Sequence, residues 1–276
     1  MERQETECIS LDGLKLKGSF WSAANESCAN VLIIHGLGEH HRRYDHVAQV
    51  LTGKGLNVYA YDQRGHGISD GKKGHSPSQE HLHADLDSYI KYILERSDQP
   101  LFLYGHSFGG NVLTSYLLKK GKDIIKGAII SAAWFRLAFE PPKFEVALGR
   151  LMNKIWPAYT QSNQLDSGDL TNDPEVNEAY NKDPLVHDKI SAALFVNAYA
   201  TGYWCIDNAS ELKNRALLIH GQDDPIIDVK GSEDFANKSG DNVSLKIWSD
   251  TKHEPHNDLK KSEVIDHICE WIKLQL

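Results

Sequence analysis

The stretch Leu101-Phe102-Leu103-Tyr104-Gly105-His106-Ser107-Phe108-Gly109 decides the fold expected for this chain. Its first four residues form an apolar run of the kind buried in parallel sheets, and helical periodicity begins after it, from Val112 to Leu118. Between the two lies the pattern G-x-S-x-G. A serine on a sharp strand-to-helix turn needs a glycine on either side because β-carbons there would collide. The order of strand, motif and helix therefore predicts an exposed nucleophile at Ser107.

Further short apolar runs surround this motif along the chain and predict the other strands of one sheet: Val31 to Ile34, Val58 to Tyr61, Ala128 to Ile130, Ala216 to Ile219 and Val243 to Trp248. Helical patterns separate most of them, at Tyr44 to Leu51, Leu82 to Ile93 and Val264 to Ile272. This alternation predicts an α/β fold with a mostly parallel central sheet covered by helices on both faces. Cys8 to Trp21 alternates around Asp12-Gly13, which predicts two antiparallel edge strands joined by a two-residue turn.

The alternation breaks once, from about Trp134 to Asn214, where helical periodicity dominates. We expect a core domain of residues 1–133 and 215–276, with residues 134–214 forming a helical cap inserted between two strands. One apolar stripe inside this cap consists of Phe144, Ala147, Leu148, Leu151 and Ile155. The stripe fits a helix packed on the sheet or its neighbours and a lid that faces substrate equally well, since amphipathicity alone does not separate them, and we expect the helix to do both.

Composition limits the partners of the chain. The formal net charge of -8 disfavours binding to the negatively charged phosphate backbone of nucleic acids, so nucleic acid is not an expected partner. The four cysteines show no C-x-x-C or Cys/His ligand spacing, and neither a metal nor a cofactor is expected. The start, Met1 to Glu7, is polar, and no apolar run approaches the roughly 20 residues of a membrane span. A cytoplasmic protein is expected.

A serine nucleophile needs a base, and the base needs an acidic partner that fixes its tautomer. On this fold the partners follow in the order Ser, Asp, His. The run Ala216 to Ile219 leads into a loop with three candidate acids, Asp223, Asp224 and Asp228. The last predicted strand leads into a loop with two candidate bases, His253 and His256. The spacing alone leaves these alternatives open.

Acyl transfer also needs donors aimed at the developing oxyanion. The backbone amide of Phe108, directly after the nucleophile, is one candidate. The other is the amide of Leu37, because His35-Gly36-Leu37-Gly38 follows the strand run that ends at Ile34.

Several longer motifs resemble the monoacylglycerol lipase and lysophospholipase-like branch of the α/β hydrolases: His35 to His40, Arg43-Tyr44, Asp62 to Ser69, Gly105 to Gly110, Asp183 to His187 and His253 to Asn257. The resemblance runs from the first hairpin to the last helix. It implies Asp224 as the acid and His253 as the base. It also implies that the cap shapes a tunnel for an acyl chain and makes a transient contact with a membrane surface. Phe108 stands where the family usually has methionine, which predicts a narrower acyl pocket.

The function expected first is hydrolysis of carboxylic esters, namely of monoacylglycerols to fatty acid and glycerol through an acyl-enzyme. A lysophospholipase and a short-chain carboxylesterase are alternatives of the same class. A lyase or a binding protein of this fold is a third alternative, which loss of a triad residue would favour, and none is lost. Dehalogenases and epoxide hydrolases carry Asp at the position of Ser107, which disfavours both.

Overall fold

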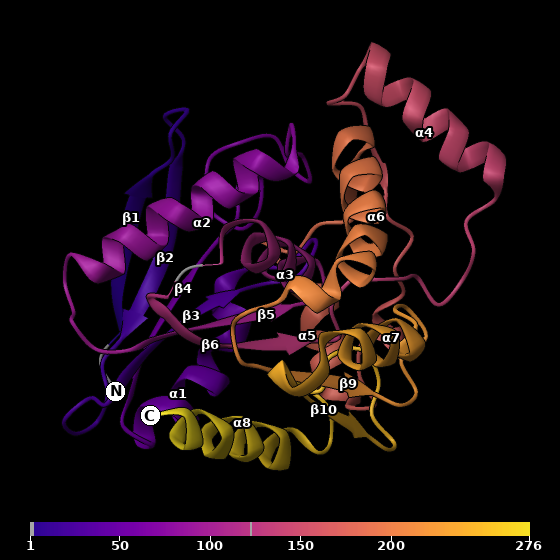
Figure 1. The fold of residues 1–276 in the computed structure, drawn as a ribbon. Helices are drawn as coiled ribbons and strands as arrows, with labels where there is room; N and C mark the ends of the chain where they lie inside the picture. Colours follow the sequence, from indigo (N-terminus) through magenta and orange to yellow (C-terminus); the bar gives the residue numbers. More distant parts are fainter. Residues whose placement is uncertain (1–2, 122) are drawn as a thin grey trace.

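A single eight-stranded sheet organises the chain in the computed structural model, which describes residues 3–121 and 123–276. The strand order is β1-β2-β4-β3-β5-β6-β9-β10 (Figure 1). β1 and β2 are antiparallel to their neighbours, and all later neighbours in the sheet are parallel. The expected, mostly parallel sheet is confirmed. The strands are β1 Arg3–Ile9, β2 Lys15–Trp21, β3 Ala29–Ile34, β4 Leu56–Tyr61, β5 Leu101–His106, β6 Ile125–Ser131, β9 Ala216–Gly221 and β10 Val243–Trp248.

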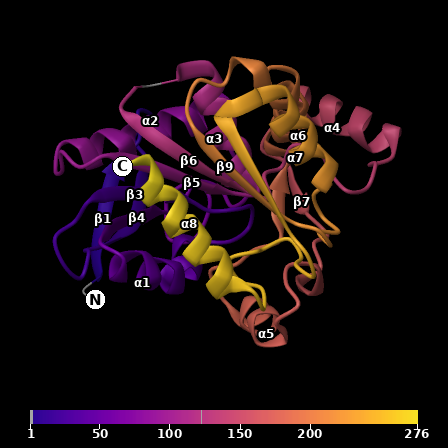
Figure 2. The same ribbon diagram turned by 60° about the horizontal axis from the view of Figure 1, so that its bottom comes forward.

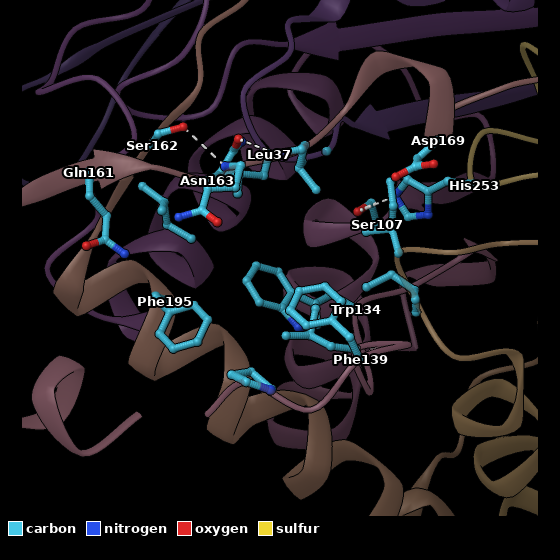
Figure 3. Close-up of a pocket in the computed structure, with 18 of the residues that line it drawn as sticks. Leu37, Ser107, Trp134, Phe139, Gln161, Ser162, Asn163, Asp169, Phe195 and His253 are labelled. Carbon is cyan, nitrogen blue, oxygen red and sulfur yellow. Dashed lines mark hydrogen bonds between the residues drawn. The ribbon is translucent and has the colours of Figure 1, made fainter. Parts of the chain in front are cut away.

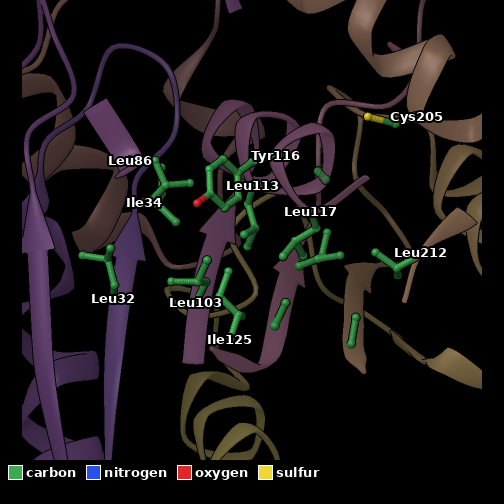
Figure 4. Packing of buried hydrophobic residues seen from close by; sticks show 14 of the residues in the cluster. Leu32, Ile34, Leu86, Leu103, Leu113, Tyr116, Leu117, Ile125, Cys205 and Leu212 are labelled. Atoms are coloured by element: carbon green, nitrogen blue, oxygen red, sulfur yellow. The ribbon is translucent and has the colours of Figure 1, made fainter. Parts of the chain in front are cut away.

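Alternate residues of each central strand pack on opposite faces of the sheet, which is why these strands read as continuous apolar runs. In β5, Leu101 and Leu103 pack on one face, on which Figure 4 shows Leu103, while Phe102 and Tyr104 pack on the other. The first face is covered by α2 (Gln79–Leu94), α3 (Phe108–Lys120) and α7 (Val229–Ser239). The second is covered by α1 (Asp45–Gly53) and α8 (Lys261–Gln275), and Figure 2 brings α8 to the front. Helices therefore cover both faces, as expected.

The connection between β1 and β2 corrects one expectation. Ile9 pairs with Lys15, so the loop spans residues 10–14 and the predicted two-residue turn is wrong. The Ser10 hydroxyl is the physical reason, since it accepts a hydrogen bond from the Leu14 amide at 2.8 Å and donates one to Asp12 at 2.6 Å. Gly13 still occupies the left-handed region, with φ of 87°. The dipeptide thus marks the bend without setting its length.

The segment between β6 and β9 folds as a separate run of small elements: α4 Lys143–Ile155, β7 Thr160–Ser162, the 3₁₀ turn η2 Ser167–Asp169, α5 Pro174–Lys182, β8 Lys189–Ser191 and α6 Ala192–Asp207. β7 and β8 form a two-stranded antiparallel ribbon that the sequence did not predict. Each strand has only three residues and little apolar character, so neither gives a periodic signal.

Helix α4 lies at the edge of the molecule, with α6 between it and the sheet (Figure 1). It packs against α6 at Gly149, where an added β-carbon would meet Val196 and Phe195 at 3.6 and 3.8 Å. The large side chains of its apolar stripe are at least half exposed, from 52% at Leu151 to 69% at Phe144. The stripe is therefore not buried in the core, although the helix that carries it packs on its neighbour α6.

A membrane span is not found among the described helices, since none of them is both long and apolar enough to cross a bilayer.

Candidate active site

Ser107 lies on the turn between β5 and α3, at the carboxyl edge of the sheet. Its φ of 52° and ψ of -116° place a non-glycine residue in a strained conformation. Gly105 and Gly109 permit that turn, because a β-carbon on Gly105 would lie 2.6 Å from the Gly109 carbonyl oxygen and one on Gly109 would collide with the Ile34 and His35 carbonyls. The side chain of Ser107 is consequently held out of the sheet, at the wall of a cavity (Figure 3).

His253 and Asp224 complete a hydrogen-bonded chain with Ser107. His253 Nε2 lies 2.9 Å from Ser107 Oγ, and His253 Nδ1 lies 2.7 Å from Asp224 Oδ2. The carboxylate only accepts, so Nδ1–H donates to Asp224 and Nε2 is left to accept the hydroxyl proton of Ser107. The three residues come from the ends of β5, β9 and β10, which meet at one edge of the sheet.

The loop after β9 places the three candidate acids in different surroundings. Asp224 is buried, and its Oδ1 accepts hydrogen bonds from the amides of Ile226 and Ile227 at 2.9 and 3.0 Å. Asp223 is exposed to solvent. Asp228 accepts from the Lys230 amide at 3.0 Å and so caps α7. Only Asp224 reaches His253.

His256, the second candidate base, packs beneath the site and contacts rings instead of Ser107. Its imidazole stacks on Tyr44 with ring centroids 4.7 Å apart and meets His106 edge-on at the same separation. Burial and nearby positive charge lower the pKa of His256 to about 3. It is therefore a neutral packing residue at ordinary pH.

The buried pair of His253 and Asp224 is electrostatically coupled. Burial alone would raise the pKa of Asp224, but the charge of His253 and hydrogen bonds from His220 and His253 bring it below its usual range. Burial alone would lower the pKa of His253, and the Asp224 carboxylate overcomes this and raises it. An ionised Asp224 thus stabilises the imidazolium that a general base becomes.

The loop after β3 carries the predicted oxyanion donor Leu37. The Glu39 carboxylate accepts a hydrogen bond from the Gly36 amide at 2.5 Å. The Leu37 amide is the next donor along this loop. Phe108 begins α3, so its amide belongs to the first turn, where no acceptor exists inside the helix. Both positions therefore suit donors to an oxyanion beside Ser107.

Above Ser107 lies a cavity of about 840 Å³, within the size range of small-molecule sites. One part of its wall is apolar and is built from Leu137, Phe139, Phe144, Leu148, Met152 and Phe195. Gln161 and Asn163 line another part, distant from Ser107 in Figure 3. Leu37, Ser107 and His253 share the cavity with these residues, so a bound molecule would reach the nucleophile directly.

Phe108 does not narrow this cavity, contrary to expectation. Its ring is fully buried and lies edge-on to Trp134, with ring centroids 6.5 Å apart. Among the described residues, Phe108 is not one of those that line the cavity. The helix that begins at Phe108 turns this side chain toward the core, and Trp134 supplies the wall.

Two supporting groups were not expected from the sequence. His220 Nε2 lies 3.0 Å from Asp224 Oδ2, so the acid has a second imidazole neighbour. Arg43 bridges the buried carboxylates of Glu39 and Glu254, with bonds of 2.6 to 2.7 Å. The available signal was adjacency, because His220 lies at the end of the strand that leads to the candidate acids and Glu254 directly follows His253.

No group of three or more His, Cys, Asp or Glu side chains within residues 3–121 and 123–276 is arranged to hold a metal ion.

Comparisons with known proteins identify the family of this chain. Residues 25–260 match the family model described as Serine aminopeptidase, S33. An abhydrolase domain-containing protein of Dictyostelium discoideum is 37% identical over 92% of this chain, and the chain spans 27% of that protein's length. A monoacylglycerol lipase of Mycolicibacterium smegmatis is 29% identical, with 98% of this chain and 97% of that protein covered. The crystal structure of a Paleococcus ferrophilus monoacylglycerol lipase superposes with a TM-score of 0.87, at 29% identity and with 100% of both chains covered.

The resemblance to monoacylglycerol lipases drawn from the motifs is confirmed by these relatives. The family match covers far more than half of the residues, and the sheet has the parallel order and covering helices of that fold. The chain therefore belongs to the Serine aminopeptidase, S33, family of the α/β-hydrolase superfamily.

Proposed function

We propose that this chain is a carboxylic ester hydrolase that cleaves monoacylglycerols to fatty acid and glycerol. The observation that carries the proposal is the hydrogen-bonded chain from Ser107 through His253 to Asp224 at the wall of a largely apolar cavity. The named activity of the relatives from M. smegmatis and P. ferrophilus supports the substrate class.

In the proposed mechanism, Ser107 Oγ attacks the ester carbonyl carbon while His253 Nε2 takes the hydroxyl proton. The amides of Leu37 and Phe108 stabilise the oxyanion. The intermediate collapses to an acyl-enzyme, and His253 returns the proton to the glycerol oxygen that leaves. Water then attacks the acyl carbonyl with His253 again as base, which releases the fatty acid and restores Ser107.

We also propose that residues 134–214 act as a cap over the core formed by 1–133 and 215–276. Phe144 and Leu148 on α4 line the cavity and are exposed, so they suit an acyl chain or a lipid surface. Lys143, Arg150 and Lys154 lie on the same helix and suit anionic lipid head groups. Peripheral association with membranes through α4 follows from this proposal.

The function is tested by a fluorophosphonate probe together with a turnover screen. The probe should label Ser107 alone, and Ser107→Ala should abolish both labelling and hydrolysis of monoacylglycerols. Monoacylglycerols of increasing chain length, lysophospholipids and p-nitrophenyl esters separate a lipase from the two related esterase activities. Labelling at another serine, or wild-type turnover by Ser107→Ala, would refute the proposal.

A further inference from the structure

A carboxylate without a partner lies at the catalytic end of the cavity. Asp169 ends the turn η2 and lines the cavity together with Ser107 and His253. Figure 3 shows it at the same end as those two residues, away from Gln161. Within the described part of the chain, its carboxylate forms neither an ion pair nor a hydrogen bond.

The position of Asp169 is fixed relative to His253. Lys252, just before the histidine, donates from Nζ to the Gly168 carbonyl at 2.7 Å. Glu254, just after it, donates from its amide to the Leu170 carbonyl at 2.8 Å. The residues on both sides of Asp169 are thus bonded to the residues on both sides of His253.

The turn that carries Asp169 is also rigid by itself. The Asp166 side chain accepts the Gly168 amide at 2.9 Å, and the Asp166 carbonyl accepts the Asp169 amide at 3.1 Å. These bonds fix the backbone of Asp169 at the cavity wall and leave its carboxylate free to contact a bound molecule.

The Lys252 ammonium, which bonds to the Gly168 carbonyl, lies outside the cavity wall and forms no ion pair with Asp169 among the described residues. Arg43 is the single Lys or Arg among the described residues of the wall, and it is already shared by Glu39 and Glu254. A charge on the leaving group of a substrate would therefore interact with Asp169 in a partly buried site, where screening by water is weaker than in solution.

We propose that Asp169 determines the charge selectivity of the leaving-group side, so that esters with an anionic head group are disfavoured relative to neutral polyol esters, and cationic ones are favoured. This inference rests on the proposed esterase function and deepens it. A lysophospholipid with a phosphate monoester would be repelled, whereas a monoacylglycerol presents only hydroxyl groups that a carboxylate accepts from.

Three water-soluble butyryl esters test the inference without a lipid surface: monobutyrin (neutral), butyrylcholine (cationic) and 1-butyrylglycerol 3-phosphate (anionic). In Asp169→Asn, kcat/KM for the anionic ester relative to monobutyrin should rise about three- to tenfold. The ratio for butyrylcholine should fall by a similar factor. Raising the salt from about 0.05 M to about 0.5 M should shrink the wild-type differences.

Two variants serve as controls. Asp169→Glu keeps the charge and should keep the wild-type ratios. Glu175→Gln removes the same charge from an exposed position on α5 outside the cavity wall and should also leave both ratios unchanged. If Asp169→Asn leaves both ratios unchanged while the wild-type protein hydrolyses monobutyrin, the inference about Asp169 is overturned and the proposed function stands. A wild-type protein that hydrolyses none of the three esters and resists the fluorophosphonate probe would overturn the proposed function as well.

Discussion

His40 Nε2 donates a 2.8 Å hydrogen bond to Asp183 Oδ2, which joins the loop after β3 to the segment after α5. A second bond runs beside it, from the His187 amide to the Gly38 carbonyl at 2.8 Å. The loop that carries Leu37 is therefore held by Asp183 and His187 as well as by Glu39 within the loop. The precision of an oxyanion donor depends on such supports, since a displacement of a few tenths of an ångström weakens its hydrogen bond.

Asp183→Asn tests this support. The new amide still accepts the Leu185 amide, as Asp183 Oδ1 does at 2.9 Å, but its NH₂ group or its neutral oxygen is a poorer partner for His40. We expect kcat to fall roughly three- to tenfold with KM nearly unchanged, a fraction of the loss from removing a donor. The control is Asp188→Asn, an exposed residue five positions on that pairs with Lys189. Equal kcat values in the two variants would contradict the role of the His40–Asp183 hydrogen bond in supporting the loop that carries Leu37.

Asp224→Asn should reduce kcat on the order of 10⁴-fold, the size of the loss seen when the triad aspartate of a serine protease becomes asparagine, because the amide disfavours the tautomer that leaves Nε2 free to accept. Asp223→Asn is the matched control, one residue away and exposed, and should cost less than about twofold. Steady-state rates on one monoacylglycerol suffice. A larger loss of kcat in Asp223→Asn than in Asp224→Asn would show that Asp223 is the acid of the triad.

The arrangement of strands was predictable because it depends on short-range patterns that survive in the sequence. The runs that became β3, β5 and β9 are apolar on both faces, and the strained turn at Ser107 requires its flanking glycines. The sequence alone could not distinguish the acid from the neighbouring aspartates. Asp223 and Asp224 differ only in which way the loop turns after β9, and the amides of Ile226 and Ile227 fix that turn.

The segment 134–214 was less predictable because long-range contacts place its parts. Asp169 reaches the site since Gly168 and Leu170 bond to Lys252 and Glu254, more than 80 positions along the chain. No local pattern encodes such a contact. The ribbon of β7 and β8 is similarly fixed by pairing of Gln161 with Ile190 and not by periodicity.

The pH dependence of kcat/KM should follow His253. The group must be neutral to accept a proton, and its pKa is raised by the Asp224 carboxylate against the effect of burial. Activity on a neutral ester should therefore fall as pH decreases, with a midpoint above the ordinary histidine value of about 6.5. Circular dichroism at each pH separates titration from unfolding. A midpoint below about 6 with the fold intact would contradict the raised pKa.

Arg43→Ala should destabilise the protein strongly, by about 3–5 kcal/mol, because it leaves two buried carboxylates, Glu39 and Glu254, without their shared cation. Arg42→Ala is the control at the adjacent position. The Arg42 side chain is half exposed, and its ion pair with Asp45 is long, at 4.0 Å. Removing it should therefore cost less than about 1 kcal/mol. Urea unfolding of both variants measures the difference. Equal midpoints would mean that the buried carboxylates are protonated or hydrated in the folded state.

The last prediction concerns α4. Leu148 and Leu151 are 54% and 52% exposed, so replacing both by Ser removes little buried surface and should lower stability by less than about 1 kcal/mol, against about 2–5 kcal/mol per large residue in a core. Turnover of long-chain monoacylglycerols should fall severalfold while hydrolysis of p-nitrophenyl acetate stays nearly unchanged, since the short ester needs no apolar wall at α4.

Leu274→Ser is the matched control for that double variant, because Leu274 is 82% exposed on α8 and lies outside the cavity wall. It should alter neither the melting temperature nor the preference for chain length. Binding to anionic vesicles should weaken in the α4 variant and persist in the α8 variant if the helix contacts lipid surfaces. A large melting shift of the α4 variant with unaltered chain-length preference would show that the stripe stabilises the cap and does not serve the substrate.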